Sequence, residues 1–231
     1  MGPIIRVLTV AVAVAAVVTT AAAGPPKPIK MHPADALKKY CGGKTIETKL
    51  LFKGSVETKF KGDCGLVLGE YGQLGTGKGG KIEIDGHFTI AHEARAAGSG
   101  EVQIERDSTL VADMVVMVTG RVEVKSGATV KSHTQVGIIA RDALRIKKQA
   151  SVTANDGKIT LETKGTARIL SGASLAASKG VEVYAPEAAC DVSKSAVITE
   201  QPAAKMCMTG PRAPDDEQLP VNQHGSQWWW W

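Results

Sequence analysis

Four carboxylates recur at the polar positions of short segments in which apolar and polar residues alternate. Glu83 and Asp85 lie in one segment, Glu105 ends a second and Glu123 lies in a third. Hydrolysis or elimination on a polysaccharide requires carboxyl groups held at a defined separation in a groove. If the segments lie side by side, these residues form acidic rows on one face. A small polysaccharide-acting lyase or hydrolase is therefore one hypothesis for this chain.

Basic residues alternate with these carboxylates, and opposite charges on neighbouring strands stabilise a sheet slightly. The pattern predicts that Lys81, Glu101 and Arg121 stack, that Lys125 lies over Glu105, and that Lys147 lies over Glu162. We expect these to be solvent-facing strand residues, and coils this short leave no room for the long loops that form the groove of a polysaccharide-acting enzyme, so no catalytic residue is assigned. The candidate binding face consists of Lys81, Glu83, Asp85, Glu101, Glu105, Arg121, Glu123 and Lys125.

His92, Asp113 and His133 follow the first apolar residue of their segments by 10 or 11 positions, so they could approach one corner of a repeat. Two imidazoles and a carboxylate can hold a transition metal. Two strand spacings separate the histidines by about 10 Å, which is too far for a shared ion. We therefore predict solvated turn residues and no metal site. The Gly-rich segment 72–79 has Gly79 where a phosphate-binding loop needs Ser or Thr, so no cofactor is predicted.

The N-terminal segment determines the expected localisation. Arg6 precedes an apolar stretch over 7–18, and small residues crowd the positions up to Ala23. This pattern is typical of a secretory signal peptide cut after Ala23. An uncleaved membrane anchor is the alternative, because 4–23 is nearly long enough to span a bilayer, and membrane contact would then come only from this segment. We expect a secreted, periplasmic or cell-surface protein.

Four cysteines follow, at Cys41, Cys64, Cys190 and Cys207. An even number in an exported chain indicates disulfide bonds. Three pairings are possible, and the spacing favours Cys41–Cys64 and Cys190–Cys207, each closing a loop of roughly 20 residues. The sequence contains no C-x-x-C, so neither a zinc site nor a thioredoxin-like redox site is supported.

The elements that must position these residues repeat about every 20 residues. Alternation of apolar and polar residues is the pattern of a half-buried strand, and such short repeats bury their apolar faces by stacking. Only 4% of the residues are aromatic and 25 are Gly, which suits thin coils. The first inward residues are Ile82, Val102, Val122, Leu144, Ile159 and Val181, and a second apolar column includes Leu110, Val130 and Val152.

This repeat predicts an all-β fold, a right-handed parallel β-helix (solenoid) of about six short coils with capped ends. Ile82, Val102 and Val122 are expected to touch along one spine. An antiparallel β-sandwich is the alternative, because strands about every ten residues also suit it.

The predicted organisation has five parts. They are a signal peptide at 1–23, a linker and short N-terminal helix at 24–40, N-terminal capping strands at 41–79, a β-solenoid with a C-terminal cap at 80–207, and a disordered tail at 208–231. The tail ends in Trp228–Trp231, to which no function is assigned.

The phrases Gly100–Ile104, Gly120–Val124 and Ser126–Val130 resemble the coils of exported right-handed β-helix proteins of the filamentous-haemagglutinin adhesin type. Those coils run Gly-x-Val-x-Val and then turn through Ser-Gly-Ala. The resemblance covers about residues 80–200 and implies a rigid exported solenoid, and no catalytic residue carries over. Bactofilins look similar in coil style, but they act in the cytoplasm.

The net charge is +5, yet basic and acidic residues are interleaved, so no nucleic-acid partner is predicted. We expect an exported non-enzymatic structural or binding protein of the cell envelope or surface, which presents polar ladders for adhesion, glycan binding or self-assembly. The expected partners are a glycan, another envelope protein or a further copy of the chain.

Overall fold

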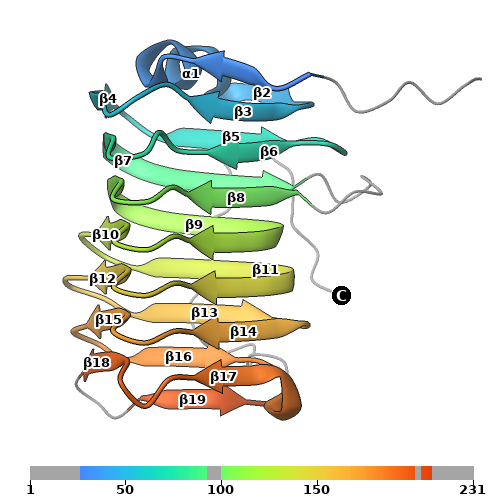
Figure 1. Cartoon of the computed structure of the whole chain (residues 1–231). Coiled ribbons are helices and arrows are strands. Elements are labelled where there is room, and N and C mark those ends of the chain that lie inside the picture. Colours follow the sequence, from blue (N-terminus) through green and yellow to red (C-terminus); the bar gives the residue numbers. More distant parts are fainter. Residues whose placement is uncertain (1–26, 93–99, 201–203, 210–231) are drawn as a thin grey trace, which may run out of the picture.

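The computed structural model describes residues 27–92, 100–200 and 204–209, and these form one stack of β-strand turns (Figure 1). The stack is a β-solenoid of about seven turns. Every strand pairing among the described residues is parallel. Parallel pairing confirms the solenoid and excludes the antiparallel sandwich.

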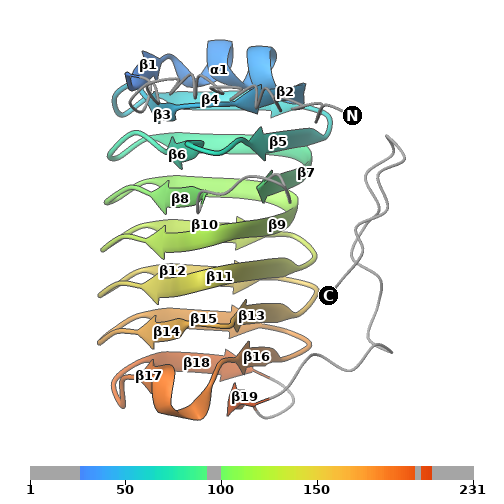
Figure 2. The same cartoon turned by 90° about the vertical axis from the view of Figure 1, so that its right-hand side faces the viewer.

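Each turn contributes a strand to three faces, named here A, B and C, and the strands of each face lie in rows along the stack (Figures 1 and 2). Face A contains β1 (Ile29–Met31), β3 (Lys49–Phe52), β6 (Gln73–Gly75), β8 (Glu101–Ile104), β14 (Thr166–Ile169) and β17 (Cys190–Val192). Face B contains β4 (Glu57–Lys61), β10 (Thr129–Ser132), β12 (Ser151–Ala154), β15 (Ser174–Ala177) and β18 (Val197–Glu200). Face C contains β2 (Gly42–Ile46), β5 (Cys64–Leu68), β13 (Ile159–Thr163), β16 (Val181–Tyr184) and β19 (Lys205–Met208).

Three long strands bend round the corners between faces. β7 (Lys81–His92) runs from face B to face C, β11 (Val136–Ile146) runs from C to A, and β9 (Thr109–Val124) crosses all three. A short 3₁₀ helix, η1 (Glu187–Ala189), precedes β17. From β4 onward the chain therefore passes through the faces in the order B, C, A, whereas in the first turn α1 (Pro33–Tyr40) stands where a face B strand would lie.

The core consists of inward columns that extend from turn to turn. On face A, Val102 stacks on Val122, and Val122 stacks on Leu144, as the repeat predicts. Ile82 does not belong to this spine, because it pairs with Thr58 and Leu110 on face B. The expectation of one Ile82–Val102–Val122 column is therefore wrong for Ile82.

The physical reason is that the length of a turn varies. One turn takes 28 residues from Ile82 to Leu110, 20 from Leu110 to Val130 and 22 from Val130 to Val152. Alternation identifies a strand but does not say on which face the strand lies. Residues separated by 20 positions can consequently lie on different faces.

The N-terminal end of the stack is covered by α1 (Pro33–Tyr40), where the sequence predicts a short helix (Figure 1). The ring Nδ1 of His32 accepts a hydrogen bond from the main-chain N–H of Ala34 at 3.3 Å and caps the helix. Ala36 and Leu37 are buried against the first turn. Polar caps of this kind keep a solenoid from stacking end to end.

Strands within 41–79 pair in parallel with those that follow. Leu50 of β3 stacks on Leu74 of β6, and Leu74 stacks on Val102 of β8. The same three-faced stack thus extends N-terminal to residue 80, and β1 already pairs with β3.

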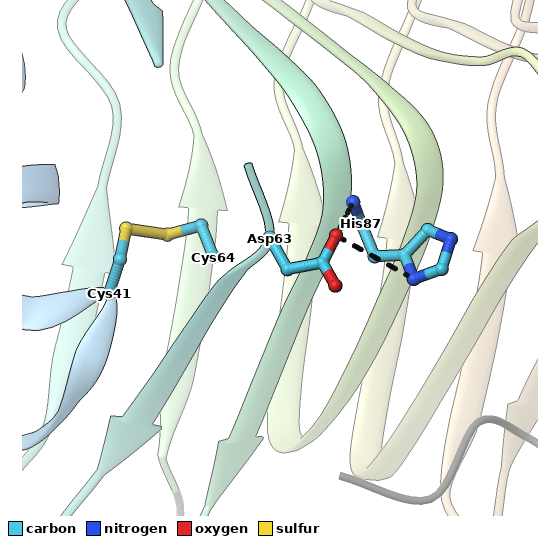
Figure 3. The surroundings of a disulfide bond; sticks show 4 residues. All are labelled: Cys41, Asp63, Cys64 and His87. Atoms are coloured by element: carbon cyan, nitrogen blue, oxygen red, sulfur yellow. Dashed lines mark hydrogen bonds and ion pairs between the residues drawn. A yellow bond between two sulfur atoms is a disulfide. The ribbon is translucent and has the colours of Figure 1, made fainter. Parts of the chain in front are cut away.

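Two disulfide bonds join the predicted cysteine pairs. Cys41, at the end of α1, is bonded to Cys64 of β5 (Figure 3). Cys190 of β17 is bonded to Cys207 of β19. One bond thus lies at each end of the stack, and disulfides persist in oxidising compartments outside the cytosol. The predicted signal peptide and the tail residues Trp228–Trp231 lie outside the described residues.

Candidate functional site

The candidate binding face divides between two faces of the solenoid. Lys81, Glu83 and Asp85 lie on the face B part of β7. Glu101, Arg121 and Glu123 lie on face A, while Glu105 and Lys125 follow the ends of their face A strands. The eight residues therefore do not form one surface, because β7 carries three of them on face B while β8 and the end of β9 lie on face A.

On face B, the charges of β4 and β7 neutralise one another. The Lys81 ammonium lies 2.8 Å from Glu57 and 3.3 Å from Glu83, and the Lys59 ammonium lies 3.1 Å from Glu83. The hydrogen bond to Lys59, and then that to Lys81, lowers the pKa of Glu83. A carboxyl group with a lowered pKa is ionised at neutral pH and is unsuited to donate a proton as a general acid.

At the end of face A, Lys125 lies 2.8 Å from Glu105, so this predicted ion pair is confirmed. Glu101 and Arg121 are register neighbours as expected, whereas Lys81 lies on face B and does not join their ladder. The pairing of Lys147 with Glu162 is wrong. Lys147 lies 3.0 Å from Glu123 instead.

Glu162 faces outward on a different face, between Ile139 and Tyr184 on face C. Lys147 follows the face A end of β11, so the solenoid keeps the two residues on separate faces.

Asp85 and Glu105 lie at opposite ends of face B. Lys81 and Asp85 are four steps apart along β7, which is about 13 Å of extended strand. Glu105 lies beyond the Lys81 end, because it precedes Thr109, the register partner of Lys81. The carboxyl pairs of glycosidases are about 5–9.5 Å apart. These two carboxylates therefore do not have the geometry of that catalytic pair.

The histidines lie at different corners. His133 is exposed at the corner between faces B and C, next to Asp113 of the preceding turn. His92 ends the face C part of β7 and is only 6% exposed, with its Nδ1 3.3 Å from an Arg141 guanidinium nitrogen. The prediction of a solvated turn residue is therefore wrong for His92. Within the described ranges, no group of three or more His, Cys, Asp or Glu could hold a metal ion.

Face C differs from the predicted polar ladder. Between β5 and β11 its outward positions include Val67, Ala91, Val118 and Ile139, which follow one another in register. The polar ladders of this solenoid are consequently concentrated on faces A and B in these turns.

A buried carboxylate near the C-terminal end was not predicted from the sequence. Glu182 of β16 is only 7% exposed, although its alternation pattern indicates an outward residue. Its carboxylate lies 2.8 Å from the Lys158 ammonium, 3.5 Å from that of Lys205, and accepts a hydrogen bond from the Tyr184 hydroxyl at 2.9 Å. Burial acts to raise the pKa of Glu182, but the bonds from Lys158 and Tyr184 and the two ammonium charges lower it overall.

This environment predicts a pH-dependent contribution to stability. Because the folded-state pKa of Glu182 is lowered, its stabilisation is complete above the unfolded-state value and is lost as pH falls through the folded-state value. We expect Glu182→Gln to lower the free energy of unfolding at neutral pH by about 1–3 kcal/mol. At acidic pH, below the folded-state pKa of Glu182, the variant and the original protein should converge.

Urea unfolding at the two pH values checks this expectation. Asp85→Asn is the matched control, because Asp85 is exposed and its carboxylate joins no ion pair among the described residues. A Glu182→Gln protein that loses as much stability on acidification as the original would contradict the expectation.

Comparisons with protein-family models, with curated proteins and with solved structures find no match to this chain. Among the residues that the structure describes, no helix has the length and hydropathy needed to cross a membrane.

Proposed function

We propose that this chain is an exported, non-enzymatic structural or binding protein of the cell envelope or surface. The observation that carries the proposal is the register of charged side chains along a stack of parallel turns, seen in the Lys81–Glu57 and Lys125–Glu105 pairs. A disulfide-closed stack holds such side chains at fixed spacing and suits a repetitive ligand. The coil phrases shared with filamentous-haemagglutinin-type adhesins support the same role.

The geometry of the carboxylates favours binding over catalysis. Glu83 is held ionised by two lysines, and Asp85 and Glu105 are separated by the width of face B. Hydrolysis of a glycosidic bond needs one carboxyl group with a raised pKa at a short, defined distance from the second. A repetitive glycan or another envelope protein is therefore the partner class that we propose, with self-association as a further mode of assembly.

The test combines binding with turnover on the full chain. We expect retention of the protein on a glycan array and no release of reducing sugar from the same glycans. Release that is abolished by Asp85→Asn or Glu105→Gln would overturn the proposal and establish the polysaccharide-acting enzyme instead. Failure to bind any glycan, combined with recovery in the cytosolic fraction of cells, would also overturn it.

A further inference from the structure

The later turns of face A carry three exposed arginines, Arg121, Arg145 and Arg168, here named the arginine strip. Arg145 of β11 and Arg168 of β14 are direct register neighbours. Their strands are therefore about 4.8 Å apart, and like charges placed directly opposite destabilise a sheet. Arg121 lies one turn earlier and one outward position along the strand, since its own register partner is Ala143.

Three carboxylates neighbour this strip, and none forms an ion pair with its arginines in the described part of the chain. Glu101 is the register neighbour of Arg121, but its carboxylate accepts a hydrogen bond from the Gln103 side-chain amide at 2.6 Å. Glu123 is the register neighbour of Arg145, but its carboxylate lies 3.0 Å from the Lys147 ammonium. Asp191 is the register neighbour of Arg168, and no ion pair joins the two in the described part of the chain. The lysines of face B are different, because Lys59 and Lys81 are both engaged by glutamates.

Two short side chains lie beside Arg145 and Arg168. Ala143 and Thr166 are register neighbours, and each lies at the outward position preceding Arg145 or Arg168 on its strand. The row of Arg121 therefore continues with two short side chains, whereas in the next row Glu123 precedes Arg145 and Arg168. These short side chains leave the exposed Arg145 and Arg168 side chains accessible from this side.

We propose that the arginine strip binds the anionic groups of a linear polyanionic glycan that runs along the solenoid axis. Each planar guanidinium can donate two parallel hydrogen bonds to a carboxylate or sulfate group. The three cations follow the stacking direction over successive turns, which suits a polymer with repeated charges. This inference rests on the proposed function and names the ligand class.

The test measures binding of the full chain to immobilised heparin, to polygalacturonate and to neutral dextran. We expect binding to at least one of the two polyanions, which separate sulfate from carboxylate recognition, and none to dextran. Arg145→Gln with Arg168→Gln should weaken binding by about tenfold or more, from the loss of charge-assisted hydrogen bonds. Asp191→Asn should strengthen binding, because it removes the carboxylate beside Arg168.

Lys44→Gln with Lys179→Gln is the matched control, because it removes the same charge at two exposed lysines on or next to face C, away from the arginine strip and from the candidate binding face. This control should change the affinity by less than about twofold. Equal losses in the two double variants would overturn the strip in favour of a general effect of net charge.

Two other outcomes would also overturn this inference. Preferential capture by phosphatidylserine vesicles or by DNA, lost in the arginine variant, would assign the strip to a membrane or a nucleic acid. Binding to neutral glycans that is unaffected by the arginine variant would remove the inference and leave the proposed function intact. Release of reducing sugar would overturn the proposed function. The effect of the arginine variant on affinity tests the arginine strip separately from that outcome.

Discussion

Replacing Gly157 by Ala is expected to lower the free energy of unfolding by about 3 kcal/mol or more, at the upper end of overpacking effects. Gly157 is buried where the chain turns from face B to face C, just before β13. A Cβ at this position would overlap the carbonyl oxygen of Thr134 in the preceding turn. The obstructing atom is main chain, so no side-chain rotation can relieve the contact.

Moving the Gly157 main chain away from Thr134 would also disturb the following turn. The Gly157 carbonyl oxygen accepts a hydrogen bond from the Lys179 N–H at 2.9 Å, so moving Gly157 disturbs both of its neighbours along the stack. Gly42→Ala is the control, because a Cβ at Gly42 has no neighbour within 4 Å. Urea unfolding should find Gly42→Ala unchanged or slightly more stable. A Gly157→Ala protein as stable as the original would show that the turns are not closely stacked at this corner.

The strands were predictable because inward and outward residues alternate with little interruption. Val102, Ile104, Val122 and Val124 are all buried, and their polar neighbours face outward. The cysteine pairs were predictable for a related reason: each pair is close in sequence and bridges neighbouring parts of one end of the stack.

The assignment of strands to faces was not predictable from alternation. A residue pattern with period two carries no information about whether the next strand continues the same face or begins another. Ile82 and Val102 are 20 positions apart and belong to faces B and A, whereas Leu110 and Val130 are 20 apart and stack directly. The number of residues at each corner decides whether two residues 20 positions apart stack on one face or lie on different faces. No residue pattern in the sequence marks the length of a corner.

The same limitation explains the outcome for the charged residues. Lys125 and Glu105 follow neighbouring face A strands 20 residues apart, so the repeat predicts their contact even though Ile82 lies on face B. Glu182 occupies an outward position, and its burial depends on Lys158 and Lys205 from the turns on either side. Arg145 and Arg168 are register neighbours across a turn of 23 residues, which a repeat of about 20 residues does not predict.

Phe88→Ala is expected to cost about 3–5 kcal/mol of folding stability, the range for removing a buried aromatic ring. Phe88 is only 2% exposed and lies in register between Cys64 and Val115 on face C. The chain has just three Phe residues, so its core is built mainly from smaller aliphatic side chains. Neighbouring main chains held by ladder hydrogen bonds cannot close the resulting cavity.

Because a solenoid is stabilised by interactions between adjacent turns, the loss should be local as well as global. Amide hydrogen exchange should accelerate most in β5, β7 and β9, and least in β15 and β18. Phe60→Ala is the control, since Phe60 of β4 is only partly buried and should cost less. Uniform acceleration along the whole stack would instead mean that the turns unfold as one cooperative unit. In that case the rigidity of the stack would come from the solenoid as a whole, closed by a disulfide at each end, and not from packing around Phe88. The regular spacing of the surface charges depends on this rigidity.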